Sequence, residues 1–187
     1  MPTDAALDTA SSRRRVLEWS DRALVAKAGQ GLDGLAFLRA MMAGEVPPPP
    51  LIALLGIDLV SAEPGRVTMR RGPGAYLCNP LGSVHGGALA SLPDSVMGCA
   101  VHATLPLGRG DTTLEITVND LRAVTAASGS LTAVGEIVHA ERRQAVAEAR
   151  LSDGAGRPCA TASTTCLLID LQPPAPDPVV AAWTRVS

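Results

Sequence analysis

Aromatic residues are almost absent from this 187-residue sequence, which contains two tryptophans, one tyrosine and one phenylalanine. Proteins that bind single-stranded nucleic acid stack bases on aromatic side chains, and nucleic-acid partners call for a basic surface. The formal net charge of this chain is −2. These two features argue against nucleic acid as a partner, and the core must be built from aliphatic side chains, alanine and methionine.

The sequence also lacks long hydrophobic runs and closely spaced cysteines. No stretch approaches the roughly 20 consecutive apolar residues that a bilayer span requires, and the first residues show no secretion signal. The cysteines contain no CxxC pair and lack the dense spacing of a disulfide scaffold. We therefore expect a cytoplasmic protein with reduced thiols and no membrane partner.

The length and the apolar fraction of 47% are typical of one compact domain with short additions. Residues 13–43 favour one or two short helices. The proline run Pro47–Pro50 favours an extended segment and is expected to exclude a helix. We predict a helical extension with a proline linker over residues 1–50, a catalytic domain over 51–170 and a flexible tail over 171–187.

Residues 85–104 are apolar on most sides and almost free of charge, a pattern typical of a buried helix. Before them, Arg66–Arg71 alternates like a strand with arginine and threonine outward, and Gly72-Pro73-Gly74 favours a hairpin or a bulged corner. A buried helix followed by strands with short connections predicts an α+β fold, an antiparallel sheet of about five to six strands wrapped around one central helix. Three or four strand-like runs follow the helix: Thr112–Arg122, Ser130–His139, Gln144–Ser152 and Pro158–Ile169.

Asp94, in the middle of the predicted helix, is the first candidate for a catalytic residue. Burial disfavours the charged form of a carboxylate, so an acid at such a position usually has a function. The alternatives are that Asp94 faces solvent or pairs with an arginine. Its helical neighbours are nearly all small, which indicates close approach of a ligand or, as the alternative, tight packing. These neighbours are Gly87, Ala90, Ser91, Met97 and Gly98.

The helix begins with His85-Gly86-Gly87, where unpaired backbone N–H groups and the positive end of the helix dipole can stabilise a carbonyl oxygen. A Gly-Gly pair at such a position also occurs as a simple turn. Gly87 and Asp94 are seven positions apart, which corresponds to about 10 Å along a helix. One chain therefore cannot bring both to the same reacting group, whereas two antiparallel copies of the helix can. We predict a homodimer at minimum, or a tetramer built as a dimer of dimers.

This segment resembles the PaaI-like hotdog thioesterases of phenylacetate catabolism, whose pattern joins an asparagine, a His-Gly-Gly start and a helical aspartate. Asn79, His85, Gly86, Gly87 and Asp94 fall on that pattern. The resemblance extends over residues 51–169 and is most specific in the helix. It implies a hotdog fold and hydrolysis of an acyl-coenzyme A (acyl-CoA) thioester, with CoA as part of the substrate and no separate cofactor or metal. An aryl or medium-chain acyl group fits the apolar lining.

The resemblance also assigns roles to the residues. Asp94 would activate a water or attack directly, while the Gly87 N–H and Asn79 of the facing subunit polarise the thioester carbonyl. His85 would position Asn79 or the substrate. Thr113 would hold the attacking water, although a threonine in a strand often has no such role.

Substrate binding is the expected role of Gly86, Ser91 and Gly98, where little side-chain volume leaves room beside the acid. Arg142 and Arg143 could meet the phosphates of CoA, or form an ordinary solvated pair in a hairpin. One residue departs from the pattern, because Pro93 removes a backbone N–H beside Asp94 and should kink the helix.

Two other activities on the same scaffold stay open, namely a hydratase or dehydratase and an acyl-CoA-binding or sensing module without turnover. A serine hydrolase is disfavoured because no Gly-x-Ser-x-Gly elbow surrounds Ser83. A zinc site is disfavoured because no compact set of four ligands is present. The role of the N-terminal extension is not decided by its residues.

Overall fold

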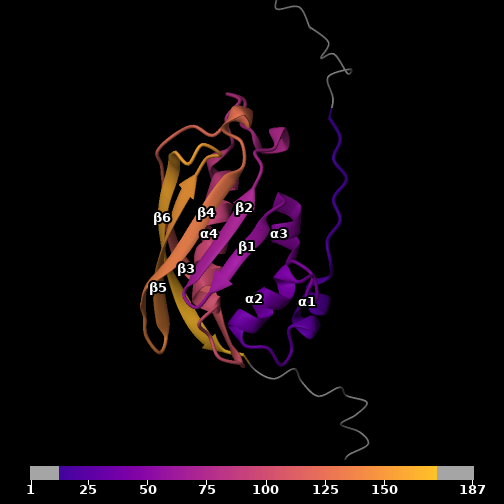
Figure 1. The fold of residues 1–187 in the computed structure, drawn as a ribbon, viewed down its shortest axis with the longest axis vertical. Helices are drawn as coiled ribbons and strands as arrows, with labels where there is room; N and C mark the ends of the chain where they lie inside the picture. Colours follow the sequence, from indigo (N-terminus) through magenta and orange to yellow (C-terminus); the bar gives the residue numbers. More distant parts are fainter. Residues whose placement is uncertain (1–12, 172–187) are drawn as a thin grey trace, which may run out of the picture.

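The computed structural model describes residues 13–171 and shows one central helix lying against a six-stranded antiparallel sheet (Figure 1). The helix is α4 (Gly86–His102), and the strands follow the order β1-β2-β4-β5-β6-β3. This is the predicted α+β hotdog arrangement. The strands are β1 (Asp58–Glu63), β2 (Arg66–Arg71), β3 (Arg109–Asp120), β4 (Leu131–Ala140), β5 (Gln144–Ser152) and β6 (Pro158–Asp170).

The apolar side chains of α4 explain why it lies inside the sheet. Leu92, Val96 and Met97 are fully buried against the inward-facing residues of the strands. The approach is very close at Gly135 in β4, where a Cβ atom would lie 2.6 Å from the backbone oxygen of Val96. Helix and sheet therefore meet backbone to backbone at this point, and only glycine fits.

Three short helices precede the sheet: α1 (Arg22–Ala28), α2 (Gly34–Met42) and α3 (Pro50–Leu55). The side chains of Asp21 and Asp33 accept N–H groups at the starts of α1 and α2, which is the usual role of an N-cap aspartate. The expectation that the proline run excludes a helix is wrong for the last proline of the run. Pro50 is the first residue of α3, a position where the missing N–H costs nothing.

Several further expectations differ from the structure. The predicted first strand is the second, because β1 precedes it and forms the hairpin with β2. After β2 the chain forms no hairpin at Gly72-Pro73-Gly74 but passes through the 3₁₀ helix η2 (Ala75–Leu77) toward α4. Arg71, expected to face outward with the other arginines of this strand, is buried with 1% of its surface exposed.

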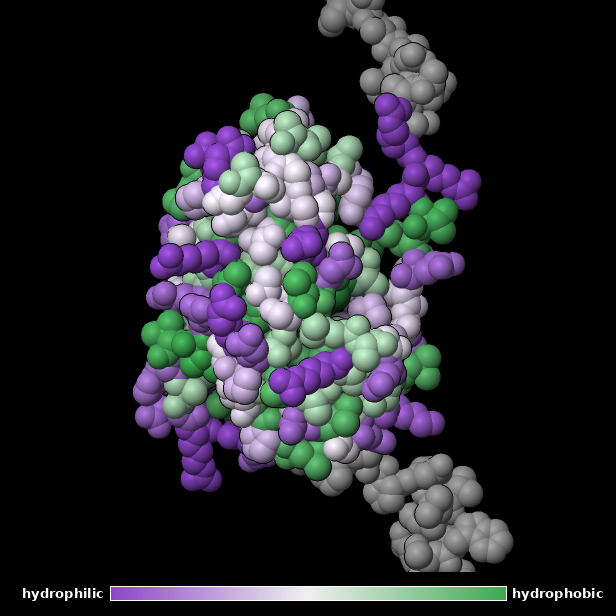
Figure 2. Space-filling view, viewed as in Figure 1, coloured by the Kyte–Doolittle hydropathy of each residue, from purple (hydrophilic) through white to green (hydrophobic). Residues whose placement is uncertain are grey.

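On the face seen in Figure 2, hydrophobic residues lie scattered among hydrophilic ones over the N-terminal helices and do not gather into one patch. None of the helices in residues 13–171 is long and apolar enough to cross a membrane. Most of the predicted flexible tail lies outside the described residues. The division of the chain at residues 50 and 170 stays a prediction.

Candidate active site

Asp94 lies on the side of α4 that faces the edge strand β3, where its carboxylate is half-buried. The Thr113 hydroxyl donates a hydrogen bond of 3.1 Å to Asp94 Oδ1. Thr113 faces the helix because it pairs in register with Cys166, which is fully buried in β6. The two residues that the sequence analysis placed in the catalytic set are therefore in direct contact within one chain.

The surroundings of Asp94 are small, as predicted. Ser91 Oγ donates to the Gly87 carbonyl oxygen over 3.0 Å, and so folds back along the helix. A Cβ atom on Gly98 would lie 3.7 Å from Asp111 Oδ2, so a second carboxylate reaches the same helix face one turn further along. Burial, followed by Asp111 and Asp94 in order of effect, raises the pKa of the neighbouring Cys99 thiol to about 12.

Pro93 lies inside α4, yet the helix continues from Gly86 to His102. Pro93 itself is buried, and the Ser95 hydroxyl donates to the Ser91 carbonyl over 2.7 Å. The sequence departure at this position therefore does not end the helix that carries Asp94.

The start of α4 differs from the expectation in one respect. His85 is the N-cap residue, and its Nδ1 atom accepts the Gly87 N–H over 3.0 Å. The prediction that this N–H is unpaired is wrong, because the capping imidazole accepts its hydrogen bond. Gly86 and Gly87 are both exposed, so the backbone is open to an incoming group.

Asn79 lies in the loop before α4, at the mouth of a cavity of about 320 Å³. Its Nδ2 donates to Ser83 Oγ over 2.9 Å and its Oδ1 accepts the Leu81 N–H. The His85 side chain accepts the Gly87 N–H, whereas the Asn79 side chain bonds to Ser83 and Leu81. The cavity is bordered by Asn79, Ser83, Gly86, Leu89, Asp120 and Arg122, among others.

Asp94 does not line this cavity. The loop with Asn79 and the start of α4 lie at one end of the cavity, and Asp94 lies about two helical turns further along α4. Within one chain, the predicted acid and the predicted carbonyl donors remain separate.

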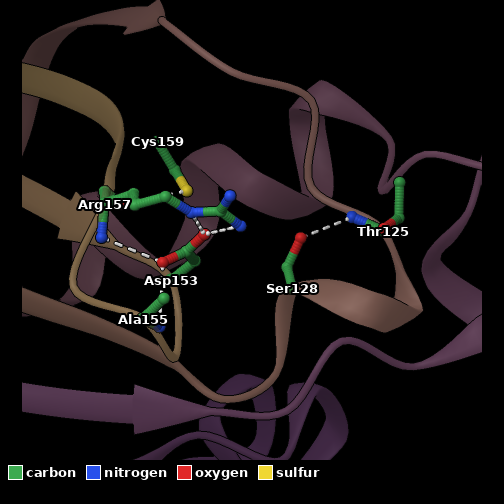
Figure 3. A network of polar contacts seen from close by, with 6 residues as sticks. All are labelled: Thr125, Ser128, Asp153, Ala155, Arg157 and Cys159. Carbon is green, nitrogen blue, oxygen red and sulfur yellow. Dashed lines mark hydrogen bonds and ion pairs between the residues drawn. The ribbon is translucent and has the colours of Figure 1, made fainter.

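The cavity wall formed by residues 120–124 is held by a neighbouring turn (Figure 3). The buried Asp153 carboxylate accepts the N–H groups of Ala155 and Arg157, and also the Arg157 guanidinium at 2.7–2.8 Å. The Gly154 N–H donates to the Ser128 carbonyl, which joins this turn to the loop after β3. In the same loop the Val124 carbonyl accepts the Val84 N–H, directly before His85. Sequence reasoning missed this support, because an Asp-Gly-x-Gly turn indicates only a hairpin.

Arg142 and Arg143 are exposed in the turn between β4 and β5. The Arg142 carbonyl accepts a hydrogen bond from Arg109, the first residue of β3, whereas Asp120 at the last position of β3 borders the cavity. The two arginines and the start of α4 thus lie at opposite ends of a 12-residue strand. One chain alone does not bring them together.

The comparisons with known proteins agree with this architecture. Residues 81–160 match the thioesterase superfamily. A conserved protein from Pseudomonas aeruginosa is 35% identical, with a TM-score of 0.61 over 65% of this chain and 95% of that protein. The chain belongs to the PaaI-like hotdog thioesterase family. The match to the thioesterase superfamily supports thioester hydrolysis as the general activity of this chain.

Two further hotdog structures are similar. A phenylacetic acid degradation-related protein from Ralstonia eutropha is 29% identical, with a TM-score of 0.65 over 70% of this chain and 98% of that one. A Streptococcus mutans protein solved with bound acetyl-CoA is 25% identical, with a TM-score of 0.57 over 63% of this chain and 91% of that one. No curated protein sequence matches the chain significantly.

Proposed function

We propose that this PaaI-like chain hydrolyses an acyl-CoA thioester with an aryl or medium-chain acyl group, using Asp94 as general base or nucleophile. The observation that carries the proposal is the contact between the Thr113 hydroxyl and Asp94 Oδ1, which holds the acid in one orientation on an otherwise apolar helix. The structure of a related protein with acetyl-CoA supports an acyl-CoA ligand.

As general base or nucleophile, Asp94 requires one free carboxylate oxygen. The Thr113 hydroxyl donates to Oδ1, and Oδ2 is the oxygen that this contact leaves available. That oxygen would accept a proton from a water, or attack the thioester carbon itself. The small side chains at Ser91 and Gly98 leave room for the thioester beside the acid.

The carbonyl would be polarised by the start of a second α4, where the Gly87 N–H and the Asn79 amide are the donors. Both donors have intramolecular acceptors, namely His85 Nδ1 for the Gly87 N–H and Ser83 Oγ for the Asn79 amide. We infer that the thioester oxygen replaces the imidazole as the acceptor of the Gly87 N–H, with rotation of the His85 side chain. Such a hydrogen bond strengthens as negative charge develops on the oxygen.

The second α4 comes from a partner subunit in this proposal. The separation between Gly87 and Asp94 demands it, and the exposed edge strand β3 with Leu114 at 57% exposure offers a surface for pairing. In antiparallel copies, the turn with Arg142 and Arg143 would lie at the end where the partner's helix begins. The two arginines would then meet the phosphates of CoA, and either a dimer or a dimer of dimers satisfies the geometry.

The test is release of free CoA thiol from benzoyl-, hexanoyl-, octanoyl- and acetyl-CoA. We expect turnover of the aryl or medium-chain substrates, and we expect Asp94→Asn to lower kcat about 100- to 10,000-fold with little change in KM. Asp58→Asn, at an exposed position in β1, is the charge-matched control. Equal rates for wild type and Asp94→Asn would leave an acyl-CoA-binding module, and hydration of an enoyl-CoA without thiol release would indicate a hydratase.

A further inference from the structure

Arg71 is the only cationic residue in the buried part of residues 13–171, where the other buried polar residues are Asp153 and Thr164. It is the last residue of β2 and points to the same side as Val67 and Met69, which are completely buried. The period-two alternation of β2 thus carries a guanidinium into the space between the sheet and α4.

The guanidinium is only partly satisfied there. One terminal nitrogen donates to the Ala88 carbonyl oxygen over 3.1 Å, while Nε and the other terminal nitrogen have no hydrogen-bond partner in the described chain. None of the ion pairs within residues 13–171 includes Arg71. By contrast, the carboxylate of Asp153, the other buried charge, accepts hydrogen bonds from Ala155 and Arg157 at both of its oxygens.

A buried charge without a counter-ion is strongly unfavourable, and an apolar side chain of the same size usually packs at lower cost. Desolvation lowers the pKa of Arg71, with a smaller opposing effect from Tyr76, yet an arginine stays charged in proteins. An anionic acceptor for the N–H groups of its two unpartnered nitrogens would remove this cost.

The position of Arg71 identifies where such an acceptor would come from. Its contact residue, Ala88, directly follows Gly87, whose N–H is the proposed carbonyl donor, and both belong to the first turn of α4. The flanking residues Gly86 and Leu89 border the 320 Å³ cavity, whereas Arg71 and Ala88 are not part of its lining. The helix start also carries partial positive charge, which adds to the attraction for an anion.

We infer that Arg71 receives a carboxylate at the far end of the substrate's acyl group, so that the enzyme prefers CoA thioesters of dicarboxylic acids. This inference rests on the proposed thioesterase function and names its substrate class. Since Arg71 contacts the turn of α4 that also carries the Gly87 N–H, a short spacer between thioester and carboxylate is expected, such as a benzene ring or a chain of a few methylene groups.

The first test uses the wild-type protein and two matched pairs of substrates. Each pair replaces a carboxylate by a methyl group: 4-carboxybenzoyl-CoA with 4-methylbenzoyl-CoA, and adipyl-CoA with hexanoyl-CoA. We expect kcat/KM to favour the acidic member of at least one pair by about tenfold or more, the range of a charge-assisted hydrogen bond. A preference for the neutral member of both pairs would overturn the inference.

The second test removes the charge. Arg71→Met should lower kcat/KM for the acidic member of a pair about tenfold more than for the neutral member and so abolish the preference, and Arg71→Lys should keep part of the preference. Arg70→Met is the matched control, because Arg70 is the preceding residue of β2 and is exposed on its outer face. Thermal unfolding of each variant shows whether it is folded, and the wild-type comparison stands without any variant.

The outcomes separate this inference from the proposed function. Turnover of neutral thioesters with no acidic preference, or a preference that survives Arg71→Met, refutes the role of Arg71 and leaves the thioesterase intact. No thiol release from any of the four substrates refutes the proposed function itself. A preference lost in Arg71→Met and retained in Arg70→Met supports both.

Discussion

Thr113 on β3 and Asp94 on α4 are joined by a hydrogen bond of 3.1 Å, in which the hydroxyl donates to Oδ1. This contact links the edge strand to the centre of the helix and fixes the direction of the carboxylate. It also explains why Thr113, and not its neighbour Thr112, belongs to the site, since adjacent residues of a strand point to opposite faces.

Removing this hydroxyl should slow catalysis without unfolding the protein. We expect Thr113→Val to lower kcat about 3- to 10-fold, the usual value of one hydrogen bond, and Thr113→Ser to restore most of the rate. Steady-state thiol release measures both. Thr112→Val, a change of the same kind on the outer face, should leave kcat unchanged, and an equal loss in this control would show that the effect comes from the strand and not from the contact.

The close approach of β4 to α4 predicts a large effect of one methyl group. In Gly135→Ala the new Cβ would lie 2.6 Å from the Val96 oxygen and 3.0 Å from the Met97 nitrogen, both backbone atoms that cannot rotate away. We expect a loss of about 1–3 kcal/mol in the free energy of unfolding, measured in urea. Gly72→Ala, where no heavy atom lies within 4 Å of the added Cβ, should be nearly neutral.

The turn of Asp153 and Arg157 predicts how stability depends on pH. The hydrogen bond from the Arg157 side chain, with further backbone bonds, lowers the pKa of Asp153 below its usual 3.8. A carboxyl whose folded pKa is lowered stabilises the fold fully above its unfolded pKa, and this stability is lost as the pH falls through the folded value. Asp153→Asn should therefore lower the melting temperature at pH 7. Near pH 2, where Asp153 of the wild type becomes protonated, the melting temperatures of wild type and variant should differ much less.

Asp153→Asn should affect the candidate active site less than it affects the stability of the fold. Asp153 acts through the loop that carries Val124 and the neighbouring wall of the cavity. A pH-independent gap in melting temperature between wild type and Asp153→Asn would contradict the assigned ionic role, and Arg157→Lys should show an intermediate gap.

Cys99 provides a check on the environment of Asp94. Burial, with added repulsion from Asp111 and Asp94, raises its pKa to about 12, so the thiol stays protonated at pH 8. We expect Cys99 to resist iodoacetamide in the native protein at pH 8 and to react after denaturation, as followed by peptide mass spectrometry. Rapid native alkylation of Cys99 would show that this face of α4 is open and the thiol ionised.

The sequence predicts the central helix well, because a long apolar stretch that begins with two glycines and carries a single acid is compatible with few structures other than a buried helix. The antiparallel strands after it are also predicted to within a few residues, since alternation and glycine turns bound them. β1 was missed because Asp58–Glu63 has an acidic residue at each end and only one buried residue, Ala62. α3 was missed because proline was taken to exclude a helix, although the first position tolerates it.

For the site, sequence reasoning placed Asp94 and Thr113 on elements that do meet. It could not foresee that His85 Nδ1 accepts the Gly87 N–H, because capping depends on a side-chain rotamer. The interpretation of Arg66–Arg71 with its arginines outward is wrong at Arg71, because alternation with Val67 and Met69 places this residue inward. The pattern was the more reliable signal at that position.

Complementation between two inactive variants shows whether each site takes its acid from one subunit and its carbonyl donors from the other. Asp94→Asn and Asn79→Ala chains carrying different tags are denatured together in equal amounts and refolded, and thiol release is compared with each variant refolded alone. A shared site predicts recovery to about a quarter of the wild-type rate, because half of the dimers are mixed and each has one intact site. A mixed sample no faster than the average of the two separate variants would contradict the claim.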